Sequence, residues 1–389
     1  MASPTVLPGK HRAALIGGGF IGPVHAEALR RIGVEVAGVL GSSPERAQGM
    51  AESLQVGRIY RDLDDLLSDS SVEVVHIASP NAYHFTQSRR CLKAGLHVVC
   101  EKPLATTSGE TSELKRLSAE RPLQVAAVNY NIRYYPLCLE MKARISRGDI
   151  GRVLNVSGSY TQDWLLRPTD YNWRVEPDGG TDLRAVADIG THWMDLTQFI
   201  LGDHIESVFA DLATFFEERR RPAGSREAFQ SNKGNDATIP VRITTEDYAA
   251  VLLRFGSGTR GTFHVSQTSA GRKNRLFLEI NGSEASLAWD SESPNQLWVG
   301  RREKPNQLLE RDPALLSPLA AAASHYPGGH AEGFPDTFKQ LFLSVYNSVG
   351  NKESGPVSYP TFSDGDREVR ICEAIVKSAS EERWAFVAE

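Results

Sequence analysis

Four ionisable side chains have the residue types and spacing that suit proton transfer. Lys102 directly follows a strand-like run of the sequence. Asp188, His192 and Asp195 come later, at spacings of four and three residues, so on a helix they share one face. A lysine or histidine can take up and return a hydroxyl proton, and an ammonium group also stabilises negative charge on oxygen. We therefore expect Lys102, His192 and Asp188 to be catalytic. Asp195 can equally cap its helix or form an ion pair on it.

A glycine-rich turn near the N-terminus has the spacing of a dinucleotide-binding loop. The motif G-x-G-x-x-G lies between a strand-like run at 12–16 and a helix-like run at 23–32, and a second strand-like run follows at 34–40. Its glycines permit a tight turn, close approach of a pyrophosphate and close packing of the helix, whose N-terminus offers N–H donors. We expect the pyrophosphate to be bound by Gly17, Gly19, Phe20, Ile21 and Gly22.

The residues after the second strand-like run help to decide whether NAD or NADP is bound. An NAD-preferring loop places Asp or Glu there, about 20 residues after the glycines, to bind the ribose hydroxyls. This sequence has Gly41 instead, followed by Ser42, Ser43 and Arg46, which can donate to a 2′-phosphate. Serines can also bind the bare ribose hydroxyl, so the cofactor is NAD or NADP, and the missing carboxylate favours NADP.

Polar residues follow two further strand-like runs, at 72–78 and 96–100. Ligands of open α/β sheets bind at the carboxyl ends of the strands. We expect the cofactor to be lined there by Ser79, Pro80, Asn81, His84, Glu101 and Lys102. The alternative is that Lys102 is a surface lysine at a strand end and that His84, like His25, is structural.

Aromatic and polar side chains alternate between residues 160 and 193, where three of the six tryptophans lie. Aromatic faces stack on a polyhydroxylated ring while polar groups bind its hydroxyls. Trp193 can instead fill a core, and His330 is a further candidate contact. We expect the substrate to be bound by Lys102, Tyr160, Trp164, Trp173, Arg174, Asp188 and His192.

Two patterns of secondary structure divide the chain. Up to residue 128, strand-like and helix-like runs alternate, which predicts a doubly wound parallel sheet. Beyond about residue 150, strand-like runs are joined by turn signals, which predicts an antiparallel sheet. The polar stretch 217–240 is interpreted as a solvated loop or sheet extension, and 367–381 as an amphipathic helix. The expected domains are 1–128 for the dinucleotide and 129–389 for the substrate and oligomerisation, with the last helices able to pack back on the first domain.

Composition excludes several classes of protein. The 389 residues suffice for two or three domains of about 150 residues, and 41% hydrophobic with 23% charged residues is typical of globular proteins. A net charge of −5 gives no support to nucleic-acid binding. We see no apolar run of about 18 residues and no signal peptide, so we expect a cytoplasmic protein without a membrane partner. The four cysteines form no CxxC pair, and we expect neither disulfides nor a metal.

Taken together, the motifs resemble those of the Gfo/Idh/MocA family of NAD(P)-dependent sugar and cyclitol oxidoreductases. The resemblance rests on the glycine motif with His25 three residues later, on 101–103 and on 188–195, in this order along the chain. The stretches 133–136 and 328–333 add to it.

This resemblance implies a Rossmann domain, a C-terminal α/β domain with a large, open, mostly antiparallel sheet, and a site at their junction. It implies that Lys102 transfers the proton and that Asp188 and His192 lie at the substrate hydroxyls. Gly41 departs from the acid that many NAD users keep at this position.

The leading hypothesis is hydride transfer between nicotinamide and a secondary alcohol or ketone of a sugar, cyclitol or glycoside. One alternative is a redox-assisted glycoside hydrolase with bound NAD, and another is a non-catalytic, cofactor-sensing regulator on the same fold. The sequence identifies neither the substrate nor the carbon oxidised. The outer face of the predicted second sheet needs covering, which suggests a homo-oligomer, either a dimer or a tetramer.

Overall fold

The computed structural model describes residues 11–175, 182–222, 238–349 and 357–388. These residues form two compact units. The first unit contains residues 11–134 and the described part of 334–369, and the second contains the other described residues. The domain boundary expected between residues 128 and 129 stays a prediction.

The first unit is built on a parallel sheet of five strands in the order β2-β1-β3-β4-β5. Its strands are β1 (Arg12–Ile16), β2 (Glu35–Leu40), β3 (Val74–Ile77), β4 (His97–Cys100) and β5 (Ala126–Val128). The winding reverses between β1 and β3, and sheets of this kind bind ligands beyond the strand ends at that point. The predicted doubly wound parallel sheet is confirmed.

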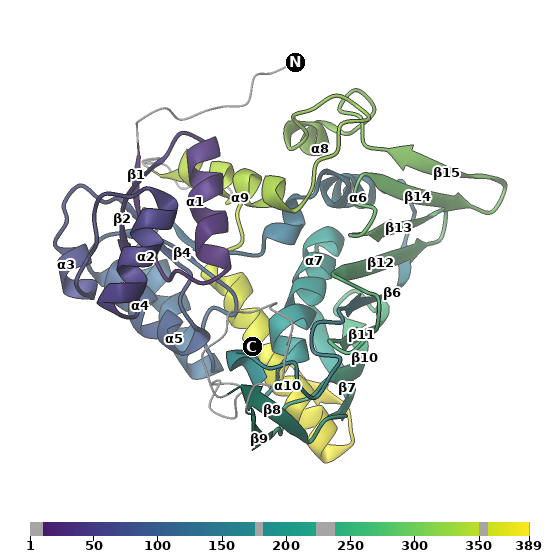
Figure 1. Ribbon diagram of the computed structural model, residues 1–389. Coiled ribbons are helices and arrows are strands. Elements are labelled where there is room, and N and C mark those ends of the chain that lie inside the picture. Colours follow the sequence, from purple (N-terminus) through teal and green to yellow (C-terminus); the bar gives the residue numbers. More distant parts are fainter. Residues whose placement is uncertain (1–10, 176–181, 223–237, 350–356, 389) are drawn as a thin grey trace. The chain divides into compact units, whose positions relative to one another are not determined.

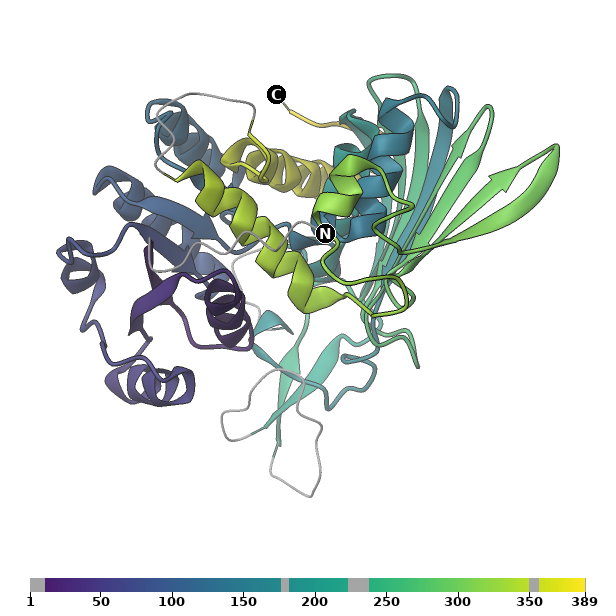
Figure 2. The same cartoon turned by 90° about the horizontal axis from the view of Figure 1, so that it is seen from above.

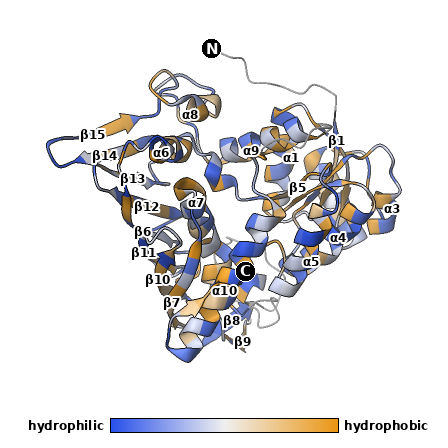
Figure 3. Cartoon of the chain, turned by 180° about the vertical axis from the view of Figure 1, so that it is seen from behind, coloured by the Kyte–Doolittle hydropathy of each residue, from blue (hydrophilic) through white to orange (hydrophobic). Residues whose placement is uncertain are grey.

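Helices cover both faces of this sheet. They are α1 (Ile21–Arg31), α2 (Pro44–Leu54), α3 (Leu63–Leu67), α4 (His84–Lys93), α5 (Ser108–Ala119) and α9 (Phe334–Ser348), with 3-10 turns η1 (Asn81–Tyr83) and η2 (Asn131–Tyr134). Residues of α1 and α9 share one core cluster with Val74, and residues of α4 and α5 share another with Val75. Because neighbouring side chains of a strand point to opposite faces, the two helix pairs lie on opposite sides of the sheet (Figure 1). Helices α4 and α5 show both hydrophilic and hydrophobic stretches in Figure 3, as expected of helices with one buried side.

The second unit is built on a sheet of nine strands in the order β15-β14-β13-β12-β6-β11-β10-β7-β16. The strands are β6 (Val153–Thr161), β7 (Ile205–Ala213), β10 (Tyr248–Phe255), β11 (Arg260–Ser266), β12 (Arg275–Gly282), β13 (Ser286–Asp290), β14 (Gln296–Arg301), β15 (Lys304–Glu310) and β16 (Ala385–Phe386). Within the described part of this sheet, β6 and β11 form the only parallel pair, and the other neighbours are antiparallel. The mostly antiparallel sheet is confirmed. β14 and β15 were not predicted, and the mostly exposed side chains of β15 lack the alternation of a half-buried strand.

One face of the nine-stranded sheet carries helices, as Figure 2 shows. They are α6 (Pro136–Ser146), α7 (Thr191–Leu201), α8 (Pro318–Ala322) and, from Arg370 onward, α10 (Phe362–Glu381). Trp193 of α7 is fully buried, stacks on Phe263 at a centroid distance of 4.8 Å, and donates its indole N–H to the Phe277 carbonyl at 2.9 Å. A Cβ atom on Gly158 would lie 2.3 Å from the indole nitrogen, so glycine makes room for the ring. Trp193 therefore fills the core of this unit.

A separate two-stranded hairpin is formed by β8 (Glu218–Pro222) and β9 (Thr238–Arg242). The interpretation of this region as a solvated charge run is wrong for Arg219, whose side chain is fully buried. It donates to the carbonyls of Leu165 and Arg167 at 3.0 Å and to Asp247 at 2.7 Å. A buried guanidinium needs such acceptors, because an unpaired charge in the core is costly. Residues 223–237 of the expected loop lie outside the described residues.

Candidate functional site

The predicted glycine loop follows β1 and leads into α1. Gly17 has a φ of +97°, and a Cβ atom on it would lie 2.4 Å from the Ala78 carbonyl oxygen. No atom lies within 4 Å of the Cβ position of Gly19, so the backbone there is open to a ligand. Phe20 is the N-cap residue of α1, and its own side chain makes no capping bond. These features fit a pyrophosphate bound at the helix N-terminus.

The end of β2 explains why the sequence carries no acid at position 41. A Cβ atom on Gly41 would lie 2.6 Å from the Ala47 backbone nitrogen, so α2 packs too closely for any side chain. Ser43 caps α2, because its hydroxyl accepts from the Arg46 N–H at 3.3 Å. Ser42 and the Arg46 side chain are exposed beside this helix start. Both are therefore accessible to a ligand at the end of β2.

The turns after β3 and β4 are joined by the buried ring of His84. Its Nδ1 lies 2.7 Å from the Pro103 carbonyl oxygen, and its Nε2 lies 2.8 Å from the Ser79 carbonyl oxygen. Burial lowers the pKa of His84, so the neutral ring donates through one nitrogen at a time. His84 thus braces the turns that carry Ser79 and Lys102. The Lys102–Pro103 peptide bond is cis.

Glu101, next to Lys102, is a buried carboxylate held by several donors. Its Oε1 atom accepts from His25 Nε2 at 2.9 Å and from the Asn129 amide. Its Oε2 atom accepts from the Lys102 backbone N–H at 3.3 Å. Burial raises the pKa of Glu101, but the hydrogen bond and charge of His25, with help from Asn129 and Lys102, bring it below the ordinary value. Glu101 is therefore ionised at neutral pH.

The second unit contains Asp188 and His192. The regular helix expected across these residues is interrupted, because Asp188 lies in a π-helical turn, η4 (Val186–Gly190), that leads into α7. Turns of this kind are frequent at functional sites. The Asp188 carboxylate accepts from Arg174 Nε at 3.1 Å and from Gln267 Nε2 at 2.9 Å. Both of its oxygens are thus held in place.

Aromatic residues flank this carboxylate. The Arg174 guanidinium lies over the Trp173 ring at 4.5 Å from its centroid, within the 3-10 turn η3 (Trp173–Val175). The rings of Tyr160 and His192 have centroids 6.3 Å apart. Burial, followed by the charge of Asp188, raises the pKa of Tyr160 far above its ordinary value, so its hydroxyl stays protonated.

Two amides tie the aromatic residues together: Gln162, one of the polar residues expected between the aromatic ones, and Asn274, which was not predicted. Asn274 Oδ1 accepts from the Tyr160 hydroxyl at 2.9 Å and from Gln162 Nε2 at 2.8 Å. Gln162 in turn accepts from the Trp164 indole N–H at 2.7 Å. Gln267, also missed, is fully buried although it is polar. The only sequence signal for Gln267 is that it ends a strand-like run.

Two further candidates, His330 and Asp195, have different surroundings. His330 is exposed and lies in a stretch held by the buried pair Arg311 and Glu332, whose charged atoms are 2.8 Å apart. Asp195 is buried within α7. The described ranges contain no cluster of His, Cys, Asp or Glu residues that could hold a metal ion. Within the same ranges, no helix is long and apolar enough to cross a membrane.

A buried carboxylate supports the turn that carries Asp188. Glu246 accepts from the backbone N–H groups of Arg184 and Val186, each at 2.8 Å. Burial raises the pKa of Glu246 to about 7 despite these bonds. The neighbouring Asp247 pairs instead with Arg184 and Arg219. Glu246 therefore changes charge near neutral pH at the start of the π-helical turn.

This pKa predicts how stability changes with pH. Glu246 keeps its proton in the folded state up to about pH 7 but loses it near pH 4.5 when unfolded, so its ionisation destabilises the fold progressively between these values. A difference of this size corresponds to roughly 3 kcal/mol. Glu246→Gln removes this contribution, and its free energy of urea unfolding should fall less than that of wild type between pH 5 and 7. Parallel pH curves for the two proteins would contradict the assignment.

Comparisons with known proteins agree with the geometry. Residues 11–130 match the model described as oxidoreductase family, NAD-binding Rossmann fold, and residues 138–288 match the GFO/IDH/MocA C-terminal domain. The chain is 29% identical to levoglucosan dehydrogenase of Pseudarthrobacter phenanthrenivorans, covering 96% of this chain and 97% of that protein. It is 28% identical to myo-inositol 2-dehydrogenase of Thermotoga maritima, covering 97% and 99%.

Solved structures give the same result. A levoglucosan dehydrogenase in complex with NADH and levoglucosan superposes with a TM-score of 0.86 at 27% identity, covering 97% of this chain and 99% of that one. An inositol dehydrogenase homolog from Azotobacter vinelandii, in complex with NADH and myo-inositol, gives 0.83 at 26% identity, covering 99% of both chains. The two family models together span more than half of the sequence, and the motif resemblance is confirmed. The chain therefore belongs to the Gfo/Idh/MocA family of NAD-binding oxidoreductases.

Proposed function

We propose that this protein is a dehydrogenase that moves a hydride between the nicotinamide of NAD(P) and a secondary alcohol or ketone of a sugar, cyclitol or glycoside. In this proposal residues 1–128 bind the coenzyme and residues 129–389 bind the substrate. The observation that carries it is the grouping of a clamped carboxylate, Asp188, with the rings of Tyr160 and His192 and the amides around them. Such a set suits a ring with several hydroxyls, and relatives named for levoglucosan and myo-inositol support it.

Each residue has a distinct part in the proposed reaction. When bound, the coenzyme supplies the carbon that accepts or returns the hydride. Lys102 takes the hydroxyl proton as the alcohol is oxidised and gives it back when the ketone is reduced. Asp188 accepts a hydrogen bond from a substrate hydroxyl, and Arg174 and Gln267 keep its two oxygens in place. His192 orients the reacting hydroxyl beside it.

The same geometry excludes Tyr160 as the base. Its hydroxyl is buried and lies near the Asp188 charge, and both effects raise its pKa. It therefore remains a hydrogen-bond donor at neutral pH, with Asn274 as its acceptor at 2.9 Å. This supports the choice of Lys102 for the acid–base role.

The first test replaces the lysine. Lys102→Met should lower kcat at least about a hundredfold, the usual scale for an acid–base group, while the Kd for NADH stays within a few-fold of wild type. The control is Lys93→Met, an exposed lysine of α4. Reduced coenzyme is followed by absorbance with levoglucosan, myo-inositol and glucose as probes. Undiminished turnover by the Met variant would remove Lys102 from the role, and release of free sugar from a glycoside without net coenzyme reduction would indicate hydrolysis instead.

We further propose that the end of β2 accepts the 2′-phosphate of NADP. Gly41 leaves no carboxylate to repel the phosphate, and Ser42 and Arg46 are exposed beside it. The relatives with NADH in their structures bind the unphosphorylated coenzyme, so this preference would be a property of this chain.

Binding measurements test the coenzyme preference directly. Arg46→Ala should raise the Kd of NADPH about tenfold or more, which is the contribution of one charge-assisted hydrogen bond. It should change the Kd of NADH less than twofold. Arg61→Ala, which removes an exposed arginine of the same unit, is the control. A wild-type protein that binds NADH tenfold more tightly than NADPH would contradict the proposal.

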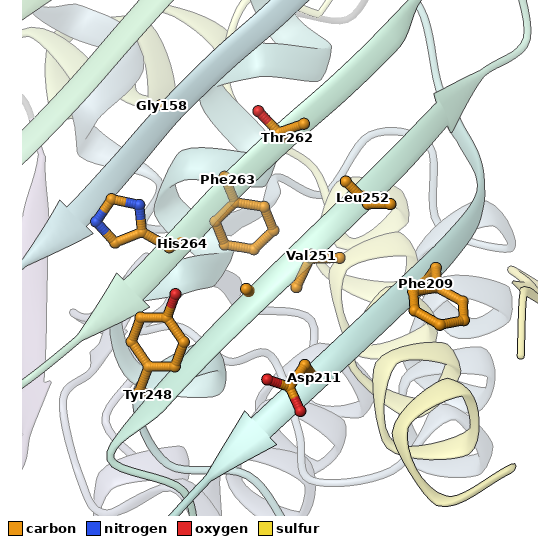
Figure 4. A pocket seen from close by; sticks show the side chains of 10 residues that line it. Gly158, Phe209, Asp211, Tyr248, Val251, Leu252, Thr262, Phe263 and His264 are labelled. Atoms are coloured by element: carbon orange, nitrogen blue, oxygen red, sulfur yellow. The ribbon is translucent and has the colours of Figure 1, made fainter. Parts of the chain in front are cut away.

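We also propose that a second copy of the chain covers the open face of the nine-stranded sheet. On this face Leu252 pairs with Phe209, and Leu308 pairs with Trp298 further across the sheet. Leu252 and Leu308 are 46% and 55% exposed, so each offers apolar area that a second copy would remove from water. A hollow of about 370 Å³ beside Leu252 is lined by Tyr248 and other residues of β7, β10 and β11 (Figure 4). Because a sheet face can pack on its own copy through a two-fold axis, a dimer or tetramer follows.

Light scattering on a size-exclusion column tests this assembly. Wild type should have the mass of two or four chains, and Leu252→Arg should shift it toward one chain because it places a charge where Leu252 would be buried against the second copy. Leu123→Arg, at an exposed leucine of the first unit, should leave the mass unchanged. A monomeric wild type would contradict the proposal.

A further inference from the structure

Four buried polar side chains of the first unit form one continuous string of hydrogen bonds that ends beside Lys102. Glu101 Oε1 lies 2.9 Å from His25 Nε2, and His25 Nδ1 lies 3.1 Å from His76 Nδ1. His76 Nε2 lies 3.0 Å from the hydroxyl of Tyr346. The string joins the end of β4 to α1, β3 and α9, and each of its side chains is buried.

The surroundings of the string are apolar. The ring of Phe342 packs edge-on against both imidazoles, with centroid distances of 5.0 Å to His25 and 4.7 Å to His76. Phe338 packs against His25 at 5.7 Å. Apolar residues of similar size often stabilise such a core as well as polar ones do, and a partly satisfied polar network is worse. Stability alone therefore does not explain why a fully connected string of polar side chains lies in this core.

The charge of Glu101 fixes the first hydrogen bond of the string. An ionised carboxylate can only accept, so His25 Nε2 must donate to Glu101. Burial, followed by the neighbouring ring of His25, keeps the pKa of His76 well below its ordinary value, so His76 is neutral. One proton lies between His25 Nδ1 and His76 Nδ1, and the Tyr346 hydroxyl completes the string at His76 Nε2. Tyr346 and His76 thereby hold the ring of His25 so that its Nε2–H group faces Glu101.

The two oxygens of the Glu101 carboxylate have different hydrogen-bond partners. Oε1 is gripped by His25 and by Asn129, while Oε2 accepts the backbone N–H of Lys102 at 3.3 Å. Rotation of the carboxylate would break both sets of bonds together. Whatever orients His25 therefore also orients the backbone from which Lys102 projects.

We propose that His25, His76 and Tyr346 are positioning residues that act on Lys102 through the carboxylate of Glu101. The inference rests on the proposed acid–base role of Lys102 and extends it to a tyrosine far away in the sequence. Partners of this kind, one shell behind a reacting group, typically change activity 10–100-fold when they are replaced.

The first experiment measures the string itself and requires no substrate. Nitrogen-15 NMR of labelled histidines should show His25 protonated at Nε2 at pH 7, with one further proton between the two Nδ1 atoms. Tyr346→Phe should move the ring signals of both histidines. Tyr60→Phe, which removes another buried hydroxyl of the same unit, bonded to Asp69 at 2.7 Å, should move neither. His25 protonated at Nδ1 alone in wild type would overturn the proposal.

The second experiment follows the consequence at Lys102. Hydrogen exchange at the Lys102 amide is obtained by mass spectrometry as the difference between two overlapping peptides, 98–101 and 98–103, because Pro103 has no amide. Exchange should be faster in Tyr346→Phe and His76→Leu than in wild type and Tyr60→Phe. Equal exchange in all four proteins would overturn the proposal. This result holds whether or not the protein oxidises a polyol, so it is distinguishable from failure of the proposed function.

Kinetics then separate positioning from mere structure. With levoglucosan or myo-inositol as probe, the folded His25→Leu variant should have a kcat about 10–100-fold lower while KM and the Kd for NADH stay near wild type. Its melting temperature should fall as well, because Glu101 loses a donor. His25→Gln keeps an N–H toward Glu101 and an acceptor toward His76, so it should restore kcat to within about threefold. In the background of His76→Leu, Tyr346→Phe should have no additional effect on kcat. A folded His25→Leu variant with wild-type kcat would overturn the proposal.

Discussion

A carboxylate removed from water must be surrounded by donors, and this requirement organises the functional parts of both units. In the first unit Glu101 collects donors from His25, Asn129 and the Lys102 backbone. In the second unit Glu246 collects the backbone N–H groups that open the turn carrying Asp188. Each carboxylate joins segments that are remote in sequence, so the chemistry-bearing backbone is held by charge as well as by packing.

The two carboxylates differ in how well their charge is balanced. Glu101 gains enough from its donors to stay ionised, whereas burial dominates at Glu246 and raises its pKa to about 7. Asp188 is more accessible and is held by the side chains of Arg174 and Gln267. In the proposed reaction, the acid–base residue Lys102 is therefore held by Glu101, a carboxylate that is ionised at neutral pH. The substrate-binding carboxylate, Asp188, lies instead on a turn held by Glu246, which titrates near neutral pH.

Local sequence patterns sufficed for the parts of the molecule that depend on neighbouring residues. The glycine loop, the alternation of the parallel strands and the antiparallel second sheet all follow from spacing within short windows. Gln267, Asn274, Glu246 and Tyr346 were not predicted, because each acts through a partner brought close only by the folded chain; 270 residues separate Tyr346 from His76. The π-helical turn and the burial of Arg219 were missed for the same reason, since Glu246 and Asp247 impose them.

The central claim is that this protein removes a hydride from a carbon atom that bears a hydroxyl. Its most direct test is NMR of the reduced coenzyme formed from polyols labelled with deuterium on carbon, such as levoglucosan, myo-inositol and glucose. The account predicts that deuterium from one of them appears at C4 of the nicotinamide. Reduced coenzyme without deuterium, or no reduced coenzyme from any sugar, cyclitol or glycoside, would contradict it.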